Sequence, residues 1–382
     1  MATYRIGICG SYGGMNLGDE AILHGMLSEL RQSVSAEVTV FSRNPEDTLA
    51  RHGVARALPT RDMARDELRP EVERLDLLIV GGGGILFDDE AQLYLREAQI
   101  AIDAGVPVLV YAVSVGPLTR RDAREVVAQT LGRATVVTVR DRPSRQLLEQ
   151  IGVKREIEVV ADPALLVRPE PAASDLLERE GVRPARHLIG ISVRERGVAA
   201  PDLNESHYHR LLADAADFMI SRYDAKLIFV PLEQRVLDVQ QSHAVIARMA
   251  YAQRANVLKE NYSVSEMLGI VERLDFAVAM RLHFLIFSAL RGVPFVALPY
   301  AGKVEGFLEA FEMRMPTVQD VRAGQLIARI DEAWDYRHEL RRKIAAHLPE
   351  MQEKARIPNR MAVDLLQGRR VGARAPAQAG SE

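Results

Sequence analysis

The sequence Tyr4-Arg-Ile-Gly-Ile-Cys-Gly-Ser-Tyr-Gly-Gly-Met-Asn-Leu-Gly-Asp-Glu20 contains the pattern that decides the fold. Its first six residues, Tyr4–Cys9, form an apolar run typical of a buried strand, and Glu20–Leu30 then has apolar residues at helical spacing. The glycines between them permit tight turns and close approach of a ligand to the backbone, and the free N–H groups that begin the helix attract anions. This strand–loop–helix unit predicts an α/β domain with an anion-binding first loop.

The same alternation continues along the chain. In the first half we expect strands at Val38–Phe41, Leu75–Val80, Val106–Val113, Val136–Val139 and Ile157–Val160, with helices at Gln92–Ala104 and Asp122–Leu131. In the second half we expect strands at Leu188–Val193, Leu227–Pro231, Asn256–Leu258, Phe276–Met280 and Phe295–Pro299, with helices at Tyr208–Arg222, Val236–Tyr251, Val264–Arg273 and Leu285–Leu290. Buried runs separated by helices indicate parallel sheets covered on both faces.

The length of 382 residues favours two domains over one core. The proline-rich and charged segment Arg168–Arg186 separates the two series and is predicted to be the linker. We therefore expect two Rossmann-like parallel-sheet domains, residues 1–167 and 187–323, facing across a cleft. Helices in 324–367 should pack back on the first domain, and residues 368–382, rich in Gly, Ala, Arg and Pro, should be a disordered tail.

Composition limits the partners and the compartment. The net charge of −3 gives no global attraction to nucleic acid or to an anionic membrane, so any anion site must be local. The single cysteine, Cys9, lies in an apolar strand and is interpreted as a small core residue. No secretory signal and no uncharged apolar stretch of about 20 residues is visible, so we expect a cytoplasmic protein with at most peripheral contact at the inner face of a membrane.

Two glycine-rich motifs follow strands of the first domain. The run Gly81-Gly82-Gly83-Gly84 costs backbone entropy that a plain turn does not require, so a ligand or the opposite domain is expected to pass close to it. A tight turn is the alternative. In the first motif Asp19 is either a functional carboxylate or a helix cap, and the residues leave this choice open.

Basic residues lie at the ends of strands in both halves. Arg140 ends one strand of the first domain and Arg194 ends one of the second, so they should face each other across the cleft and bind a carboxylate or phosphate. Ser144, which precedes a helix, is interpreted as an N-cap, and Asp162, which precedes Pro163, as a turn former.

The strongest signal is Met280-Arg281-Leu282-His283, with Lys303 after the next strand. Three ionisable groups, Arg281, His283 and Lys303, are expected to converge, and a histidine in such a setting can act as a general acid. A buried structural histidine is the alternative. No other His, Cys or carboxylate stands at metal-ligand spacing, so no metal site is expected.

Taken in order, these motifs resemble those of the polysaccharide pyruvyl transferase family. The matching stretches cover the chain from the first loop to Val304: Asn16–Leu23, Gly81–Leu86, Val139–Ser144, Asp162-Pro163, Met280–His283 and Pro299–Val304. The bacterial cell-wall enzymes that modify S-layer anchoring polymers are particularly similar, through Asn44-Pro45, Thr48 and His52–Val54. The sequence departs from that pattern at Phe87–Ala91 and at Ala301-Gly302, so the resemblance does not fix the acceptor.

The resemblance implies a GT-B-like fold and an enzyme that transfers a pyruvyl group from phosphoenolpyruvate to a sugar. The product would be a cyclic pyruvate ketal on a lipid-linked or polymeric glycan acceptor, with release of phosphate and no further cofactor. Catalytic roles would fall to His283, Arg140 and Asp19. Substrate-binding roles would fall to Asn16, Gly18, Gly82, Gly83, Gly84, Arg194, Arg281 and Lys303.

Two other functions stay open at this point. A nucleotide-sugar glycosyltransferase of the same architecture needs an acidic residue to hold a ribose, and Glu305 is the candidate. A non-catalytic sugar-binding relative requires His283, Arg140 and Arg194 to lie apart. A homo-oligomer is compatible with the sequence.

Overall fold

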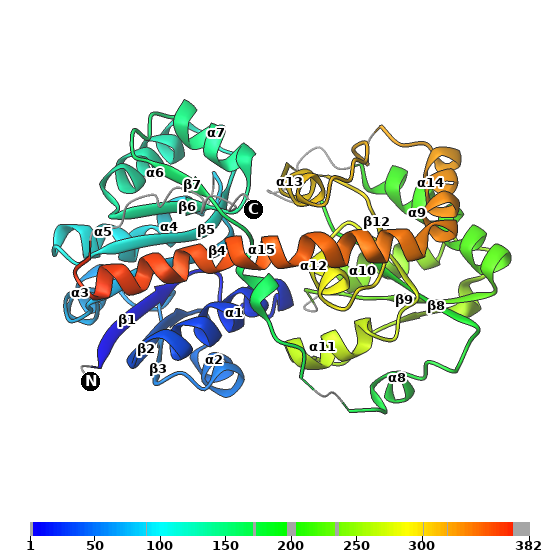
Figure 1. Cartoon of the computed structure of the whole chain (residues 1–382), viewed down its shortest axis with the longest axis horizontal. Coiled ribbons are helices and arrows are strands. Elements are labelled where there is room, and N and C mark those ends of the chain that lie inside the picture. The colour runs from blue at the N-terminus through cyan, green and yellow to red at the C-terminus, as the bar shows by residue number, and fades with distance from the viewer. Residues whose placement is uncertain are drawn as a thin grey trace, which may run out of the picture.

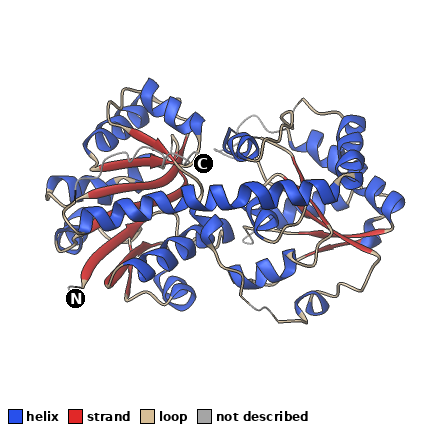
Figure 2. Cartoon of the chain, viewed as in Figure 1, coloured by secondary structure: helices blue, strands red, loops and turns tan. Residues whose placement is uncertain are grey.

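The computed structural model describes residues 3–88, 90–170, 173–196, 204–233, 237–300, 302–318 and 320–369. Two parallel β-sheets of seven and five strands lie side by side, each with helices on both faces (Figures 1 and 2). The expected two-domain, GT-B-like α/β fold is confirmed. The expected tail lies outside the described residues from position 370 onward.

The first sheet has the order β3-β2-β1-β4-β5-β6-β7 and is parallel throughout. Its strands are β1 (Tyr4–Cys9), β2 (Ala36–Ser42), β3 (Arg56–Pro59), β4 (Leu77–Leu86), β5 (Val108–Val115), β6 (Val136–Val139) and β7 (Ile157–Val159). Its helices are α1 (Leu17–Ser33), α2 (Pro45–His52), α3 (Arg65–Glu73), α4 (Ala91–Tyr94), α5 (Arg96–Asp103), α6 (Arg121–Arg133) and α7 (Arg142–Gln150), followed by the 3₁₀ turn η1 (Pro163–Leu166).

Alternate residues of the central strands belong to cores on opposite faces of this sheet. In β4, Leu77 and Ile79 pack on the α1 side, whereas Leu78 and Val80 pack on the α3 and α5 side. Burial on both faces explains why these strands are continuous apolar runs rather than alternating ones. Cys9 is buried and its thiol donates to the Ile79 carbonyl, as a small core residue.

The second sheet has the order β10-β9-β8-β11-β12 and is also parallel. Its strands are β8 (His187–Ser192), β9 (Ala225–Phe229), β10 (Ala255–Val257), β11 (Phe276–Ala279) and β12 (Phe295–Ala297). Its helical segments are α8 (Leu176–Arg179), α9 (Glu205–Tyr223), α10 (Leu237–Ile246), η2 (Ala252–Arg254), α11 (Val264–Val271), α12 (Leu282–Leu290), α13 (Gly302–Ala310) and α14 (Ala323–Asp335).

The last helix, α15 (Arg337–Leu366), runs across both domains (Figure 1). Near its start, Arg341 Nε donates to the Gly292 carbonyl of the second domain at 2.9 Å. Further along, Gln352 Nε2 donates to the Leu165 carbonyl of η1 at 3.0 Å, and Asn359 Nδ2 donates to Ser33 Oγ at 2.8 Å. The helix therefore joins the second domain to the first.

Some elements differ from the expectations. The sequence patterns missed β3, α2 and α3, which lie toward the edge of the first sheet and carry few buried residues. The helices expected in 324–367 are α14 and α15, which are separated at Tyr336. The predicted helix Val236–Tyr251 is shorter in the structure, because α10 ends at Ile246. Its first predicted residue, Val236, lies outside the described residues.

Candidate active site

The carboxyl ends of both sheets face a cavity of about 360 Å³ between the domains. Parallel sheets place their ligand sites at this edge, because the strand-to-helix loops converge there. The residues lining the cavity are Ser11, Gly14, Asn16, Asp19, Arg43, Gly84, Phe87, Glu90, Tyr94, Arg140, Arg194, Glu195, Leu232, Glu233, Leu237, Arg281, Leu282, His283, Tyr300 and Lys303.

The first loop joins the two domains at the start of α1. The Asn16 side chain accepts from Gly18 N at 3.0 Å and caps this helix, and Leu17 N donates to the Leu232 carbonyl of the second domain at 2.8 Å. Asn16, rather than Asp19, is therefore the N-cap, which removes the capping interpretation of Asp19. The sequence predicted a substrate-binding role for Asn16, but its side-chain oxygen already accepts a hydrogen bond at the start of α1.

Gly18 has a different function from the expected contact with substrate. A Cβ atom at this position would lie 1.9 Å from His283 Nδ1, so only glycine lets the imidazole pack against the start of α1. Gly18 does not line the cavity among the described residues. Its effect on the site therefore passes through His283.

Arg140, Asp162 and His283 form a buried cluster at the join between the domains. Arg140 Nη1 donates to Asp162 Oδ2 at 2.5 Å, and Arg140 Nε donates to Ser114 Oγ at 2.6 Å. His283 Nε2 lies 3.6 Å from the same Asp162 oxygen. Burial favours the neutral carboxyl group, but Arg140 and His283 outweigh it and hold the pKa of Asp162 well below its usual range.

Asp162 is thus more than the turn former expected from the sequence. Its Oδ1 does accept from Ala164 N at 2.9 Å and caps η1, while Oδ2 faces Arg140 and His283. Asp162 follows β7 and Arg140 follows β6, which are neighbouring parallel strands. That adjacency is the signal by which the sequence could have paired them.

Asp19 lies within the first turn of α1, close to the glycine run. Its Oδ1 would be 3.2 Å from a Cβ atom on Gly83, and burial raises the pKa of its carboxyl group although His283 and Ser11 act in the opposite direction. Asp19 lines the cavity together with His283. At this position Asp19 could either exchange a proton with a bound molecule or bind one of its polar groups.

The glycine run lies inside a strand and is not the turn considered from the sequence. β4 continues to Leu86, and its register with β5 shifts between Gly84 and Leu86. A Cβ atom on Gly84 would lie 3.6 Å from Lys303 Nζ and 3.8 Å from an Arg140 Nη, so Gly84 is the glycine that faces the cations. Gly82 packs against Ile22 of α1 and Gly83 has φ of +91°, and neither lines the cavity among the described residues, so their expected contact with substrate stays a prediction.

Arg281 is surrounded by carboxylates rather than open to an anion. Its Nε donates to both Asp238 oxygens at 3.1 Å, and its Nη2 donates to Glu195 at 2.8 Å and Glu233 at 3.3 Å. Burial acts against the charged form, but these carboxylates outweigh it and raise the pKa of Arg281 above its usual value. Asp238 also accepts from Leu232 N at 3.0 Å. Arg281 therefore positions the 231–233 loop that contacts α1, and it also lines the cavity, so its expected part in donor binding stays a prediction.

The second domain contributes Arg194, Tyr300 and Lys303 to the cavity. Arg194 Nη1 donates to the Tyr300 hydroxyl at 2.7 Å and its guanidinium carbon lies 4.8 Å from the Tyr300 ring centre. Lys303 Nζ lies 5.7 Å from the same ring centre. Burial is the main factor that lowers the pKa of Lys303.

Sequence reasoning missed Tyr300 and Arg43. Tyr300 follows β12, the neighbour of β11. The adjacency of parallel strands that pairs Arg140 with Asp162 could therefore also have placed Tyr300 near Arg281. Arg43 follows β2 and its Nη2 hydrogen-bonds the Tyr94 hydroxyl and lies 3.4 Å from Glu90, forming one wall of the cavity.

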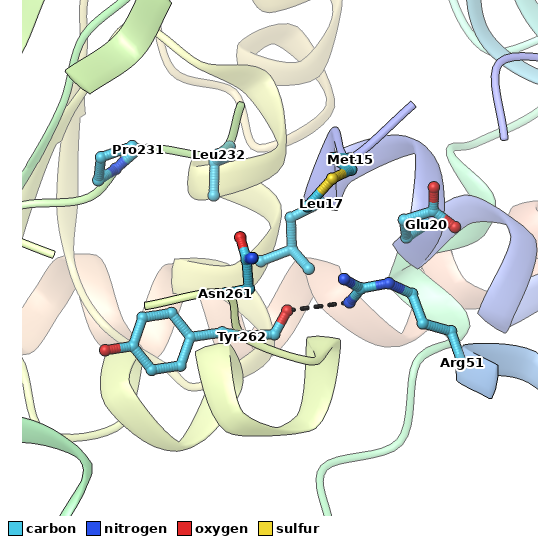
Figure 3. A pocket seen from close by; sticks show the side chains of 8 residues that line it. All are labelled: Met15, Leu17, Glu20, Arg51, Pro231, Leu232, Asn261 and Tyr262. Atoms are coloured by element: carbon cyan, nitrogen blue, oxygen red, sulfur yellow. Dashed lines mark hydrogen bonds between the residues drawn. The ribbon is translucent and has the colours of Figure 1, made fainter. Parts of the chain in front are cut away.

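Two further cavities adjoin the domain boundary. One, of about 450 Å³, shares Arg140, Leu282 and Lys303 with the first cavity and extends past Phe307 to Met351 of α15. The other has a volume of only about 20 Å³, the size of a water molecule. Figure 3 shows it beside the hydrogen bond, 3.2 Å long, from Arg51 Nη1 of α2 to the Tyr262 carbonyl of the second domain.

The comparison with known families decides the class of protein. The sequence model of polysaccharide pyruvyl transferase matches residues 16–302. The chain belongs to the polysaccharide pyruvyl transferase family. It is therefore a transferase of pyruvyl groups to polysaccharide. The matched range includes Asp19, Arg140, Asp162, Arg281 and His283, and Lys303 follows it directly.

Solved structures share the fold at low sequence identity. The complex of Anabaena Alr3699/HepE with UDP and glucose is 13% identical with a TM-score of 0.66, covering 96% of this chain and 100% of that one. The S. aureus MnaA–UDP structure is 12% identical with a TM-score of 0.65, covering 97% and 99%. A putative UDP-N-acetylglucosamine 2-epimerase from Listeria monocytogenes is 13% identical with a TM-score of 0.64, covering 95% of each chain. No curated protein matches the sequence.

Neither a membrane span nor a metal cluster is found in the part of the chain that the structure describes. No helix there is both long and apolar enough to cross a bilayer. No group of three His, Cys, Asp or Glu side chains there is arranged to hold a metal ion.

Proposed function

We propose that this chain transfers the pyruvyl group of phosphoenolpyruvate to two hydroxyls of one sugar in a cell-wall or exopolysaccharide precursor. The product is a cyclic ketal and the leaving group is phosphate. The observation that supports this most is the convergence of Arg140, Arg194 and Lys303 with His283 on one cavity between the domains.

The charges suit a small donor that carries a carboxylate and a phosphate. Such an anion needs two or three cations, and a guanidinium binds either group through two parallel hydrogen bonds. Arg194 Nε is buried and has no hydrogen-bond partner among the described residues, so it is a donor that lacks an acceptor. Gly84 leaves room beside Arg140 and Lys303 for the anion.

His283 is placed to protonate the methylene carbon of the donor. His283 lines the cavity, and its buried Nε2 lies 3.6 Å from Asp162 Oδ2. The Asp162 carboxylate, held ionised by Arg140, stabilises the protonated imidazole before the transfer. A positioned acid of this kind contributes roughly 10²–10⁴-fold to the rate.

The acceptor sugar attacks the carbon that this protonation makes electrophilic. The adjoining cavity of about 450 Å³ opens on the same Arg140 and Lys303 and offers room for a glycan larger than the donor. A lipid-linked or polymeric acceptor, in the manner of S-layer anchoring polymers, fits this open arrangement. The reaction would take place at the cytoplasmic face of a membrane.

The other two functions are less well supported. Glu305, the candidate for a ribose contact in a glycosyltransferase, does not line the cavity within the described residues. A non-catalytic relative requires His283, Arg140 and Arg194 to lie apart, but all three line the same cavity.

One assay tests the proposal directly. Purified protein is incubated with phosphoenolpyruvate and a panel of lipid-linked disaccharides, and phosphate release is measured together with the mass of the acceptor. We expect phosphate release that depends on the acceptor, and an acceptor heavier by one pyruvate less one water. Turnover of a UDP-sugar in place of phosphoenolpyruvate would instead identify a glycosyltransferase or epimerase.

A further inference from the structure

Tyr300 lies in the cavity but has no part in the mechanism above. It follows β12, directly before α13, and its hydroxyl accepts from Arg194 Nη1 at 2.7 Å. A phenol that accepts a hydrogen bond from a guanidinium is stabilised in its ionised form. The position therefore favours a phenolate at the wall of the donor cavity.

The charged groups around Tyr300 come from three separate segments. Arg194 follows β8, Lys303 lies in the first turn of α13, and Arg281 caps α12. Burial by itself would keep the phenol neutral, but these three cations outweigh it and lower the pKa of Tyr300 to about 7. The other cavity tyrosine, Tyr94, differs, because burial raises the pKa of its phenol.

We propose that Tyr300 is the general base that removes the proton from the attacking hydroxyl of the acceptor sugar. This proposal rests on the proposed function and deepens it, since it assigns the second of two proton-transfer groups. A sugar hydroxyl is a weak nucleophile, and a positioned base makes it a stronger one as the C–O bond forms.

The proton transfers of the whole reaction balance without any external acid or base. His283 gives its proton to the methylene carbon C3, the first sugar hydroxyl bonds to C2, and the hydroxyl proton passes to the Tyr300 phenolate. The C2–O bond to phosphate then breaks, phosphate leaves with the electron pair, and it takes the proton from Tyr300. The second sugar hydroxyl bonds to C2 and returns its proton to His283. Both side chains end in the state in which they began.

Other cavity groups are less suited to this step. Asp19 is buried beside Gly83 and its pKa is raised, which favours a neutral carboxyl group over a base. Lys303 faces Gly84 and Arg140, where the donor anion is expected, and its cationic form is needed there. The Asp162 carboxylate is already paired with Arg140.

The test compares wild type, Tyr300→Phe and a matched control, Tyr336→Phe, in which an exposed tyrosine loses the same hydroxyl. The kcat of wild type with phosphoenolpyruvate and an active acceptor should rise as pH increases through about 7, because the phenolate fraction rises there. Tyr300→Phe should lower kcat by about 10²-fold or more, change the donor KM much less, and remove this rise. Tyr336→Phe should behave as wild type.

A second readout needs no turnover. Ultraviolet absorbance of tyrosinate, recorded on the protein alone, should show one tyrosine that ionises near pH 7 in wild type and in Tyr336→Phe, and none in Tyr300→Phe. Fluorotyrosine at position 300 keeps the hydroxyl and the packing but is more acidic, so it should move the rise in kcat to lower pH. This variant preserves the test if Tyr300→Phe folds poorly.

The results separate the two proposals. If Tyr300→Phe turns over within twofold of wild type, or fluorotyrosine leaves the pH profile unchanged, Tyr300 is not the base although the pyruvyl transfer stands. If wild type releases no phosphate from phosphoenolpyruvate with any acceptor, the proposed function fails and the base assignment fails with it. The absorbance titration then still reports whether Tyr300 is ionised near neutral pH.

Discussion

Arg140 and Arg281 occupy corresponding places in the two sheets, but their surroundings differ. Each lies between the strand next to the edge of its sheet and the helix that follows, β6 and α7 for Arg140 and β11 and α12 for Arg281. Arg140 has one carboxylate partner, Asp162, and an Nη group close to Gly84 at the cavity. Arg281 has three, Asp238, Glu195 and Glu233. Three carboxylates thus balance the charge of Arg281, whereas a single one balances that of Arg140.

This difference shows that the charge of an arginine in a cleft must be considered together with the charges of its neighbours. Arg281 orders the loop at 231–233 and through it the contact between the domains. Arg140 orders Asp162 and still faces the cavity. The sequence shows two equivalent arginines, whereas the structure surrounds Arg281 with three carboxylates and gives Arg140 a single one.

Replacing Arg281 should produce the largest effect, and the effect should be on stability. Arg281→Met leaves the buried carboxylate of Asp238 without its cation and leaves Glu195 with Arg194 alone, which costs about 3–5 kcal/mol of unfolding free energy. Urea denaturation measures the loss. Arg121→Gln, at a side chain 92% exposed, is the control and should change stability by less than about 0.5 kcal/mol. A stable Arg281→Met protein that fails to bind phosphoenolpyruvate would reverse the roles given to the two arginines.

His283→Gln should come next, and the effect should be on turnover. Glutamine keeps much of the size and hydrogen-bonding capacity of the imidazole but cannot transfer a proton. We expect turnover to fall by about 10²-fold or more, with donor binding and melting temperature close to wild type. A lower melting temperature together with weaker binding would instead show that His283 is a buried structural histidine.

Arg140→Lys should have a smaller effect, on donor affinity. Lysine keeps the charge but loses the planar fork, so phosphoenolpyruvate should bind about tenfold more weakly, or about 1.4 kcal/mol. Isothermal titration with the donor alone measures this. Arg145→Lys, at an exposed side chain of α7, serves as the matched control. Equal donor affinity in Arg140→Lys and wild type would remove Arg140 from the donor site.

Asn16 offers the smallest and most local test. If its side chain only caps α1, Asn16→Ala should cost about 1 kcal/mol of stability, Asn16→Ser should restore most of it, and neither should change the donor KM. A large rise in donor KM in Asn16→Ser, at normal stability, would show that the amide binds substrate as the sequence first indicated.

Much of the fold followed from apolar runs, because strands buried on both faces show them clearly. Tyr4–Cys9 and Val136–Val139 were predicted at the bounds that the structure gives. Arg56–Pro59 was missed because all four residues of this edge strand are only partly buried. The glycine run was placed after the strand because glycine weakens a strand, whereas β4 continues through it and the glycines let α1 and the opposite domain approach, as the sequence predicted for the opposite domain.

The site was predictable as a location but not as a set of contacts. The rule that carboxyl ends of parallel strands meet at one edge placed Arg140, Arg194 and His283 together. It could not show that Asp162 also lies beside His283, because that approach depends on how the domains are docked. Nor could it show that Arg281 is neutralised, since its partners come from segments more than 40 residues away in sequence, such as Asp238.

The path of α15 has a mechanical consequence. The chain passes between the domains twice, once after η1 and once along α15, and the two passages touch at Gln352 and Leu165. Pro349 lies between the part of α15 that bonds the second domain, through Arg341, and the part that bonds the first. Proline removes one helical hydrogen bond and makes that turn the easiest to bend. If the domains rotate apart, Pro349 is the weak point of α15 that lies between its contacts with the two domains, whereas the second internal proline, Pro358, lies among its contacts with the first domain.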